Sequence, residues 1–90
     1  MEYNFKEEFV KNSGHFRQRF LIKKLGVTKK RFEFSLRYMK DDGLVMGPFI
    51  EKKSQVLFNL ADTYNILVSF NPNKPKKAIV QQFLQEVMFG

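Results

Sequence analysis

The sequence predicts a single α+β domain, in which three N-terminal helices are followed by a small antiparallel sheet and a C-terminal helix. The spacing of apolar residues predicts this order, because it is helical up to residue 40, alternates between residues 56 and 70, and is helical again after residue 75. The chain has 90 residues and 43% hydrophobic content, with 11 Phe, which suffices for one compact core. We therefore expect one domain over residues 1–90, with residues 74–90 as its C-terminal helix.

The first two helices are expected on either side of a polar break at residues 12–14. Over Tyr3–Lys11 the phenylalanines stand four residues apart, which is typical of a short amphipathic helix. His15–Leu25 carries apolar residues at helical spacing, with Ser13 as a candidate N-cap and Gly26 at the left-handed position that ends many helices. Residues 3–25 are thus expected to be helical apart from the break.

The third helix has the clearest boundary signals. Thr28 is a good N-cap residue, and Gly43 follows two aspartates at the expected C-terminal end. Between them the apolar residues recur at spacings of four and three, so they share one face of a helix that runs to Lys40. That face is expected to pack in the core and consists of Phe32, Leu36 and Met39.

The segment after residue 43 changes period, and two interpretations of its second part stay open. Residues 44–50 are expected to be extended with a kink, and residues 51–54 to form a polar turn. Val56–Leu60 and Tyr64–Phe70 alternate and are rich in β-forming residues, which favours two strands. The alternative is one helix capped by Ser54. Its apolar face would comprise Leu57, Leu60, Ala61, Tyr64 and Val68.

The C-terminal helix follows a stop at residues 71–75, which contain two prolines and two asparagines. Pro75 suits a first helical turn, and the helix is expected over residues 76–88. Its apolar stripe either packs on the sheet of the same domain or forms a homodimer or partner interface, because so small a core has little room for six large side chains. The stripe consists of Ile79, Val80, Phe83, Leu84, Val87 and Met88.

Basic residues are concentrated in the N-terminal half of the chain. There are 16 Lys and Arg against 9 Asp and Glu, which gives a net charge of +7. Residues 17–40 hold nine of the basic residues and only Glu33 as an acid, whereas residues 41–90 hold five of each sign. A solvated surface is the simpler interpretation, but self-repulsion at this density favours a polyanionic partner, and we expect nucleic acid.

Residues 21–45 carry a series of motifs in a fixed order. Leu25-Gly26-Val27 forms a helix end and turn, Thr28 a cap, and Gly43-Leu44-Val45 a helix end that leads into extended chain. Ser35 puts a small residue on the helix between them. In this order and spacing the stretch, 25 of the 90 residues, resembles the winged helix-turn-helix family. The resemblance implies a winged-helix fold, in which the third helix is the recognition helix and a β-hairpin wing follows it.

The exposed positions of that recognition helix depart from the family pattern. Base-reading Asn, Gln and Ser are absent from them, and Phe34 and Tyr38 stand four residues apart among Lys and Arg. Either both rings pack under the wing or against the last helix, or they form a platform that stacks unpaired bases. Bases in duplex DNA are already stacked, and an aromatic in the major groove can contact only a thymine methyl. The pattern therefore favours single-stranded DNA.

The candidate nucleic-acid site combines cations of the second and third helices with the two aromatics and two lysines of the wing. It comprises Arg17, Arg19, Lys23, Lys24, Lys29, Lys30, Arg31, Phe34, Arg37, Tyr38, Lys52 and Lys53. Catalytic residues, a metal and other cofactors are not expected, because the chain has no Cys and one His, and it lacks a glycine-rich phosphate loop. His15 is expected to be a surface or capping residue, and Asp41-Asp42 to end a helix.

The expected function is non-enzymatic binding of single-stranded DNA. The Lys, Asn, Phe and Ile usage suggests an AT-rich coding source. The chain also looks like the small accessory proteins of bacterial mobile elements, and this likeness implies a role in replication or processing of such an element. Two alternatives stay open: a dimeric transcriptional regulator that binds duplex DNA, and a protein–protein adaptor for a polymerase or helicase. No apolar run approaches a membrane span and the first residues lack a signal-peptide pattern, so we expect a cytoplasmic, nucleoid-associated protein without a membrane partner.

Overall fold

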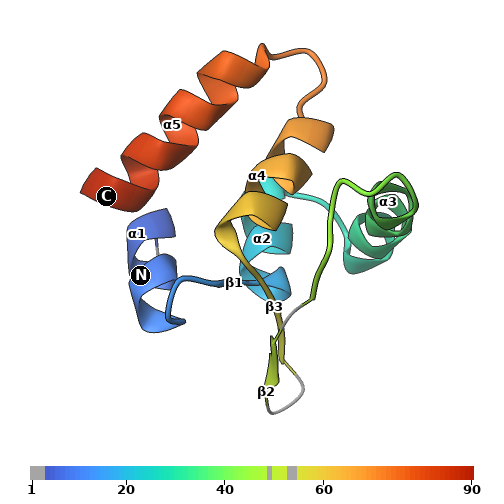
Figure 1. Cartoon of the computed structure of the whole chain (residues 1–90), viewed down its shortest axis with the longest axis horizontal. Helices are drawn as coiled ribbons and strands as arrows, with labels where there is room; N and C mark the ends of the chain where they lie inside the picture. The colour runs from blue at the N-terminus through green and yellow to red at the C-terminus, as the bar shows by residue number, and fades with distance from the viewer. Residues whose placement is uncertain (1–3, 49, 53–54) are drawn as a thin grey trace.

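The computed structural model describes residues 4–48 and 55–90 in full, and residues 50–52 by their backbone. Within these residues the α+β class expected from the sequence is confirmed. Figure 1 shows the β2–β3 hairpin projecting from a body of helices, with α3 and α5 on opposite sides of α4 in this view. The elements in chain order are α1 (Phe5–Lys11), β1 (Phe16–Arg17), α2 (Gln18–Leu25), α3 (Lys29–Asp41), β2 (Ile50–Lys52), β3 (Gln55–Phe58), α4 (Leu60–Ser69) and α5 (Lys76–Phe89).

The strands form one small antiparallel sheet in the order β1-β3-β2. β3 is the central strand, because Phe58 pairs with Phe16 of β1 and Leu57 pairs with Ile50 of β2. The first two residues of the polar turn expected at 51–54 belong to β2, and the other two lie outside the described residues. The sheet therefore joins a two-residue strand near the N-terminus to a hairpin far along the chain.

The pairing of β1 shortens the second helix relative to the sequence prediction. Residues 16–17 are extended and bonded to β3, so the helix expected over His15–Leu25 begins only at Gln18. Arg17, and not Ser13, occupies the N-cap position, and its side chain makes no capping hydrogen bond. The apolar spacing of this segment does not reveal the error, because Phe16 is buried either way.

Helix α3 follows its sequence signals closely. The Thr28 hydroxyl accepts a hydrogen bond from the Arg31 backbone N–H at 3.1 Å, which caps the helix as expected. Gly26 has a φ of 68° and Gly43 a φ of 74°, so each adopts the left-handed conformation that glycine tolerates best. The helix is thereby bounded by glycine turns on both sides.

The strand expected over Tyr64–Phe70 is wrong, because these residues belong to α4 and its C-cap. The helix alternative is correct only for residues 60–69, because Leu57 lies in β3, which confirms the first expected strand as far as Phe58. The cap of the helix is Asn59, whose side chain accepts from the Asp62 N–H at 2.8 Å. Ser54, the cap expected in that alternative, lies outside the described residues. β-Branched side chains occur in this helix because burial outweighs their weak intrinsic preference.

Asp62 fixes the extended segment that follows α3. Its buried carboxylate accepts from the backbone N–H of Met46 at 3.0 Å and from that of Gly47 at 2.7 Å. One turn later, the Asn65 side-chain amide donates to the Leu44 carbonyl at 2.7 Å. Side chains of α4 therefore satisfy backbone hydrogen-bonding groups of the segment that leads from α3 into the hairpin. A strand would not present Asp62 and Asn65 on the same side in this way.

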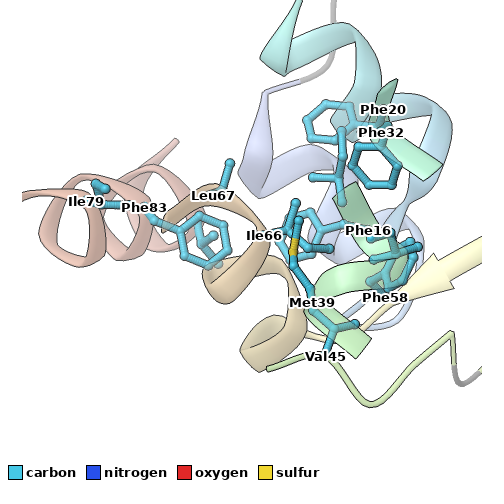
Figure 2. Close-up of a cluster of buried hydrophobic side chains, with 13 residues drawn as sticks. Phe16, Phe20, Phe32, Met39, Val45, Phe58, Ile66, Leu67, Ile79 and Phe83 are labelled. Atoms are coloured by element: carbon cyan, nitrogen blue, oxygen red, sulfur yellow. The ribbon is translucent and has the colours of Figure 1, made fainter. Parts of the chain in front are cut away.

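The core lies between all the helices and the sheet, and Figure 2 shows its phenylalanines gathered around α4. The expected inner face of α3 is confirmed, since all three of its members are buried. Phe16, Phe32 and Phe58 are fully buried and come from β1, α3 and β3. The core thus ties α3 to the paired strands β1 and β3.

The apolar stripe of α5 is divided between core and solvent. Ile79, Phe83 and Val87 are buried, and their helix packs mainly on α1 and α4. The alternative in which the whole stripe packs on the sheet is therefore wrong. Val80 is half-buried, whereas Leu84 and Met88 are exposed.

Among the described residues, no helix is long and apolar enough to cross a bilayer.

Candidate nucleic-acid interface

The outer face of α3 presents two aromatic rings to solvent. Phe34 is 57% exposed and Tyr38 59% exposed, so the interpretation that both rings pack inside is wrong. Their ring centroids lie 5.1 Å apart at an interplanar angle of 66°, an edge-to-face pair formed across one helical turn. The contact between the rings holds each of them in place while leaving more than half of its surface accessible.

A shallow groove of about 270 Å³ lies beside these rings, and we call it the α3–α4 groove. One wall is the flank of α3, and the other is formed by Leu44, Ser69 and Phe70. The Phe70 ring stacks on Phe32 of the core, with centroids 5.8 Å apart and planes 7° apart. The groove therefore has one wall of accessible aromatics and one wall anchored in the core.

Cations cluster at the N-terminal end of α3. Lys29, Lys30 and Arg31 form its first turn, are all exposed, and have no acidic residue beside them in that turn. The helix dipole places positive charge at this end, so cations here cost the helix about 0.3–1 kcal/mol each. The positive charges of these side chains, the helix dipole and the backbone N–H groups thus all attract an anionic ligand at the N-terminal end of α3.

The remaining candidate cations of α3 and α2 differ in their surroundings. Arg37, Arg19 and Lys23 are exposed. The Lys24 ammonium lies 6.0 Å from the Phe5 ring centroid and 5.6 Å from that of Phe20, so two rings hold it by cation–π attraction. These contacts favour a position of the exposed Lys24 ammonium on the side of the molecule that faces α5.

Arg17 is engaged in the fold. Its guanidinium makes two hydrogen bonds to the Glu8 carboxylate, from Nε at 2.8 Å and from Nη2 at 3.0 Å. The Arg17 backbone N–H donates to the same carboxylate at 3.0 Å, and Glu8 is fully buried. A buried carboxylate requires this compensation, so Arg17 serves to stabilise the junction of α1 and β1.

The two lysines expected in the hairpin are not described by their side chains. Lys52 lies in β2, of which only the backbone is described, and Lys53 is outside the described residues. His15 has its Nδ1 3.1 Å from the Ser13 carbonyl, and Asp41 and Asp42 are exposed at the end of α3. In the described part of the chain, no three His, Asp or Glu side chains gather as metal ligands would.

Sequence reasoning missed the contribution of the chain between α4 and α5. Phe70 ends the segment expected as a strand and Lys74 stands in the expected stop, yet both line grooves that open beside α3. No local signal points to them, because their position depends on how α4 packs against α3.

The chain matches none of the protein-family models, curated proteins or solved structures with which it was compared.

Chemically, the outer surface of α3 offers planar aromatic faces and fixed positive charge. Aromatic rings bind the faces of unpaired bases, and Lys and Arg bind phosphates without regard to sequence. The face carries no Asn or Gln for bidentate base readout. The arrangement is thus suited to stacking and charge neutralisation rather than to reading base edges.

Proposed function

We propose that this chain is a winged-helix protein that binds DNA without catalysing a reaction and prefers single strands to duplex. The arrangement of α2, a glycine turn and α3, followed by the β2–β3 hairpin, supports the fold assignment. The pairing of β1 with β3 supports it further, because it attaches the hairpin to the helical body. α3 is then the recognition helix.

The observation that carries the proposal is the exposed Phe34–Tyr38 pair among the cations of α3. Exposing two large rings has a cost in water, and single-stranded DNA offers them base faces that would bury them. Duplex DNA does not, because its bases are stacked on one another. A phosphate backbone held at the first turn of α3 would bring bases toward the rings one and two turns further on.

The test is a fluorescence-anisotropy titration of oligo-dT and of a duplex with Phe34→Ala and Tyr38→Ala. Each ring should contribute about 1–3 kcal/mol per stacked base, so each variant should lose roughly 5- to 150-fold in oligo-dT affinity. Duplex affinity should fall much less, and the free energy of unfolding should change by less than about 0.5 kcal/mol.

Phe89→Ala is the matched control, because Phe89 is 75% exposed on α5 and should leave binding unchanged. A folded Phe34→Ala/Tyr38→Ala double variant that binds oligo-dT as tightly as the wild type contradicts the proposal.

A second function is favoured by the outer face of α5. Leu84, Met88 and Phe89 are exposed there, which would suit a symmetric contact between two copies. A dimer would present two α3 helices, as a duplex-binding regulator requires. Preference for one palindromic duplex over oligo-dT, together with dimeric mass in sedimentation, would support this function over the first.

A further inference from the structure

A second and larger groove, of about 560 Å³, opens between α5 and the ends of α2, α3 and α4. We call it the α4–α5 groove. Its floor is apolar and buried, formed by Leu67, Ile79 and Phe83. Its walls carry the polar side chains of Asn71 and Gln82. The groove is thus concave, with an apolar base and hydrogen-bonding groups along its sides.

The α4–α5 groove adjoins the α3–α4 groove at the C-terminal end of α4, where Phe70 lines both of them. Arg31 lines the α4–α5 groove from α3. It precedes Phe34 by three residues and Tyr38 by seven, so it lies on the same flank of the helix as the aromatic pair. A ligand lying along that flank therefore reaches the second groove without crossing the helix.

The walls of the α4–α5 groove are positively charged. Lys24, Arg31 and Lys74 line it, against Glu86 as the one acidic side chain among its described lining residues. The Lys24 ammonium lies over the rings of Phe5 and Phe20, and the cation–π attraction favours this position on the wall. Cations at three points along a groove match the repeated charges of a phosphate backbone.

We propose that single-stranded DNA bound at the Phe34–Tyr38 pair continues past Phe70 into the α4–α5 groove, where Lys74 and Lys24 contact its phosphates. This inference rests on the proposed function and extends its binding site. An acidic protein segment could use the same charge and the apolar floor. The strand is favoured because the groove adjoins that of the aromatic pair at Phe70 and includes Arg31 from the cationic end of α3.

The test compares Lys74→Ala with Lys77→Ala on oligo-dT of two lengths, one of about 6 nucleotides and one of about 20 nucleotides, which is longer than common single-strand sites. Lys77 is the control, because it carries the same charge three residues away, is exposed and does not line the groove. Lys74→Ala should weaken the longer oligonucleotide about 3- to 10-fold and flatten its log–log salt slope by about 0.7, which corresponds to one phosphate fewer neutralised. Binding of the shorter one should not change.

Glu86→Gln gives an effect of opposite sign. Removing this carboxylate from the groove should strengthen binding of the longer oligonucleotide about 2- to 5-fold, because it removes repulsion of the phosphates. A gain of affinity cannot arise from a folding defect.

The outcomes separate this inference from the proposed function. If Phe34→Ala weakens the short oligonucleotide while Lys74→Ala and Lys77→Ala behave alike on the long one, the strand does not enter the α4–α5 groove. The groove is then open to a protein partner, and the proposed function stands. If the wild type binds neither length, both are wrong. A length-dependent loss with Lys74→Ala supports the inference.

Discussion

Helices α3 and α5 begin alike but present different outer faces. Each starts with two exposed lysines, Lys29-Lys30 in α3 and Lys76-Lys77 in α5, with no acidic residue in the first turn. Each buries three apolar side chains along its inner face. The outer face of α3 carries an aromatic pair among cations, and that of α5 carries Leu84 and Met88 beside glutamines.

The difference indicates which partner each helix suits. Planar rings that follow a cationic first turn match the base and the phosphate of a nucleotide. Flexible aliphatic side chains beside neutral amides match neither, and they are typical of surfaces that contact protein. An exposed apolar patch is therefore not informative by itself, and the charge around it determines what it can bind.

The largest expected effect tests what the two helices share, their buried faces. Leu36→Ala in α3 and Phe83→Ala in α5 should each lower the free energy of unfolding by about 2–5 kcal/mol, because each leaves a cavity in one common core. Denaturant melts beside Lys29→Ala, an exposed substitution on α3, measure this. A wild-type midpoint for Phe83→Ala would mean that α5 does not share the core with α3.

The next effect concerns the lysine pairs at the two helix starts. Lys29→Glu/Lys30→Glu should weaken oligo-dT binding about tenfold or more at low salt and flatten the salt slope by about 0.7 for each phosphate that is no longer neutralised. The same double reversal at Lys76 and Lys77 should change affinity by less than about twofold. Anisotropy titrations at several salt concentrations give both numbers. Equal losses of affinity in the two variants would mean that the affinity depends on the overall charge of the protein and not on the lysines of α3.

The smallest effect concerns the outer faces. Met88→Ser on α5 should leave the free energy of unfolding within about 0.5 kcal/mol of the wild type and oligo-dT affinity unchanged, since Met88 is 62% exposed and away from α3. Thermal melts and one titration are sufficient. A fall in sedimentation coefficient with this variant would show instead that α5 forms a contact between copies.

Local sequence signals specify the helices that have clear ends and one apolar face. Thr28 and Gly43 mark the ends of α3, and the spacing of its apolar residues marks its buried face, because both signals act within one or two turns of helix. The stop before α5 is equally clear. The placement of aromatics among cations on one face of α3 also follows from spacing, because residues four apart share a face.

Other parts of the fold depend on partners that are distant in the chain. β1 is extended because Phe16 pairs with Phe58, and a window of local sequence does not contain that partner. Residues 60–69 form a helix because Asp62 satisfies the N–H groups of Met46 and Gly47 from α4. Short apolar runs fit either period, so distant hydrogen bonds and burial choose between them.

The same reason governs the candidate site. Sequence spacing could not tell whether Phe34 is exposed or covered, because that depends on where the hairpin and α5 come to lie. Nor could it show that Arg17 binds the buried Glu8 from α1, or that Lys74 comes to line a groove beside Arg31. Exposure, ion pairing and grooves are properties of surfaces brought together by packing, and they exist only once the core has formed.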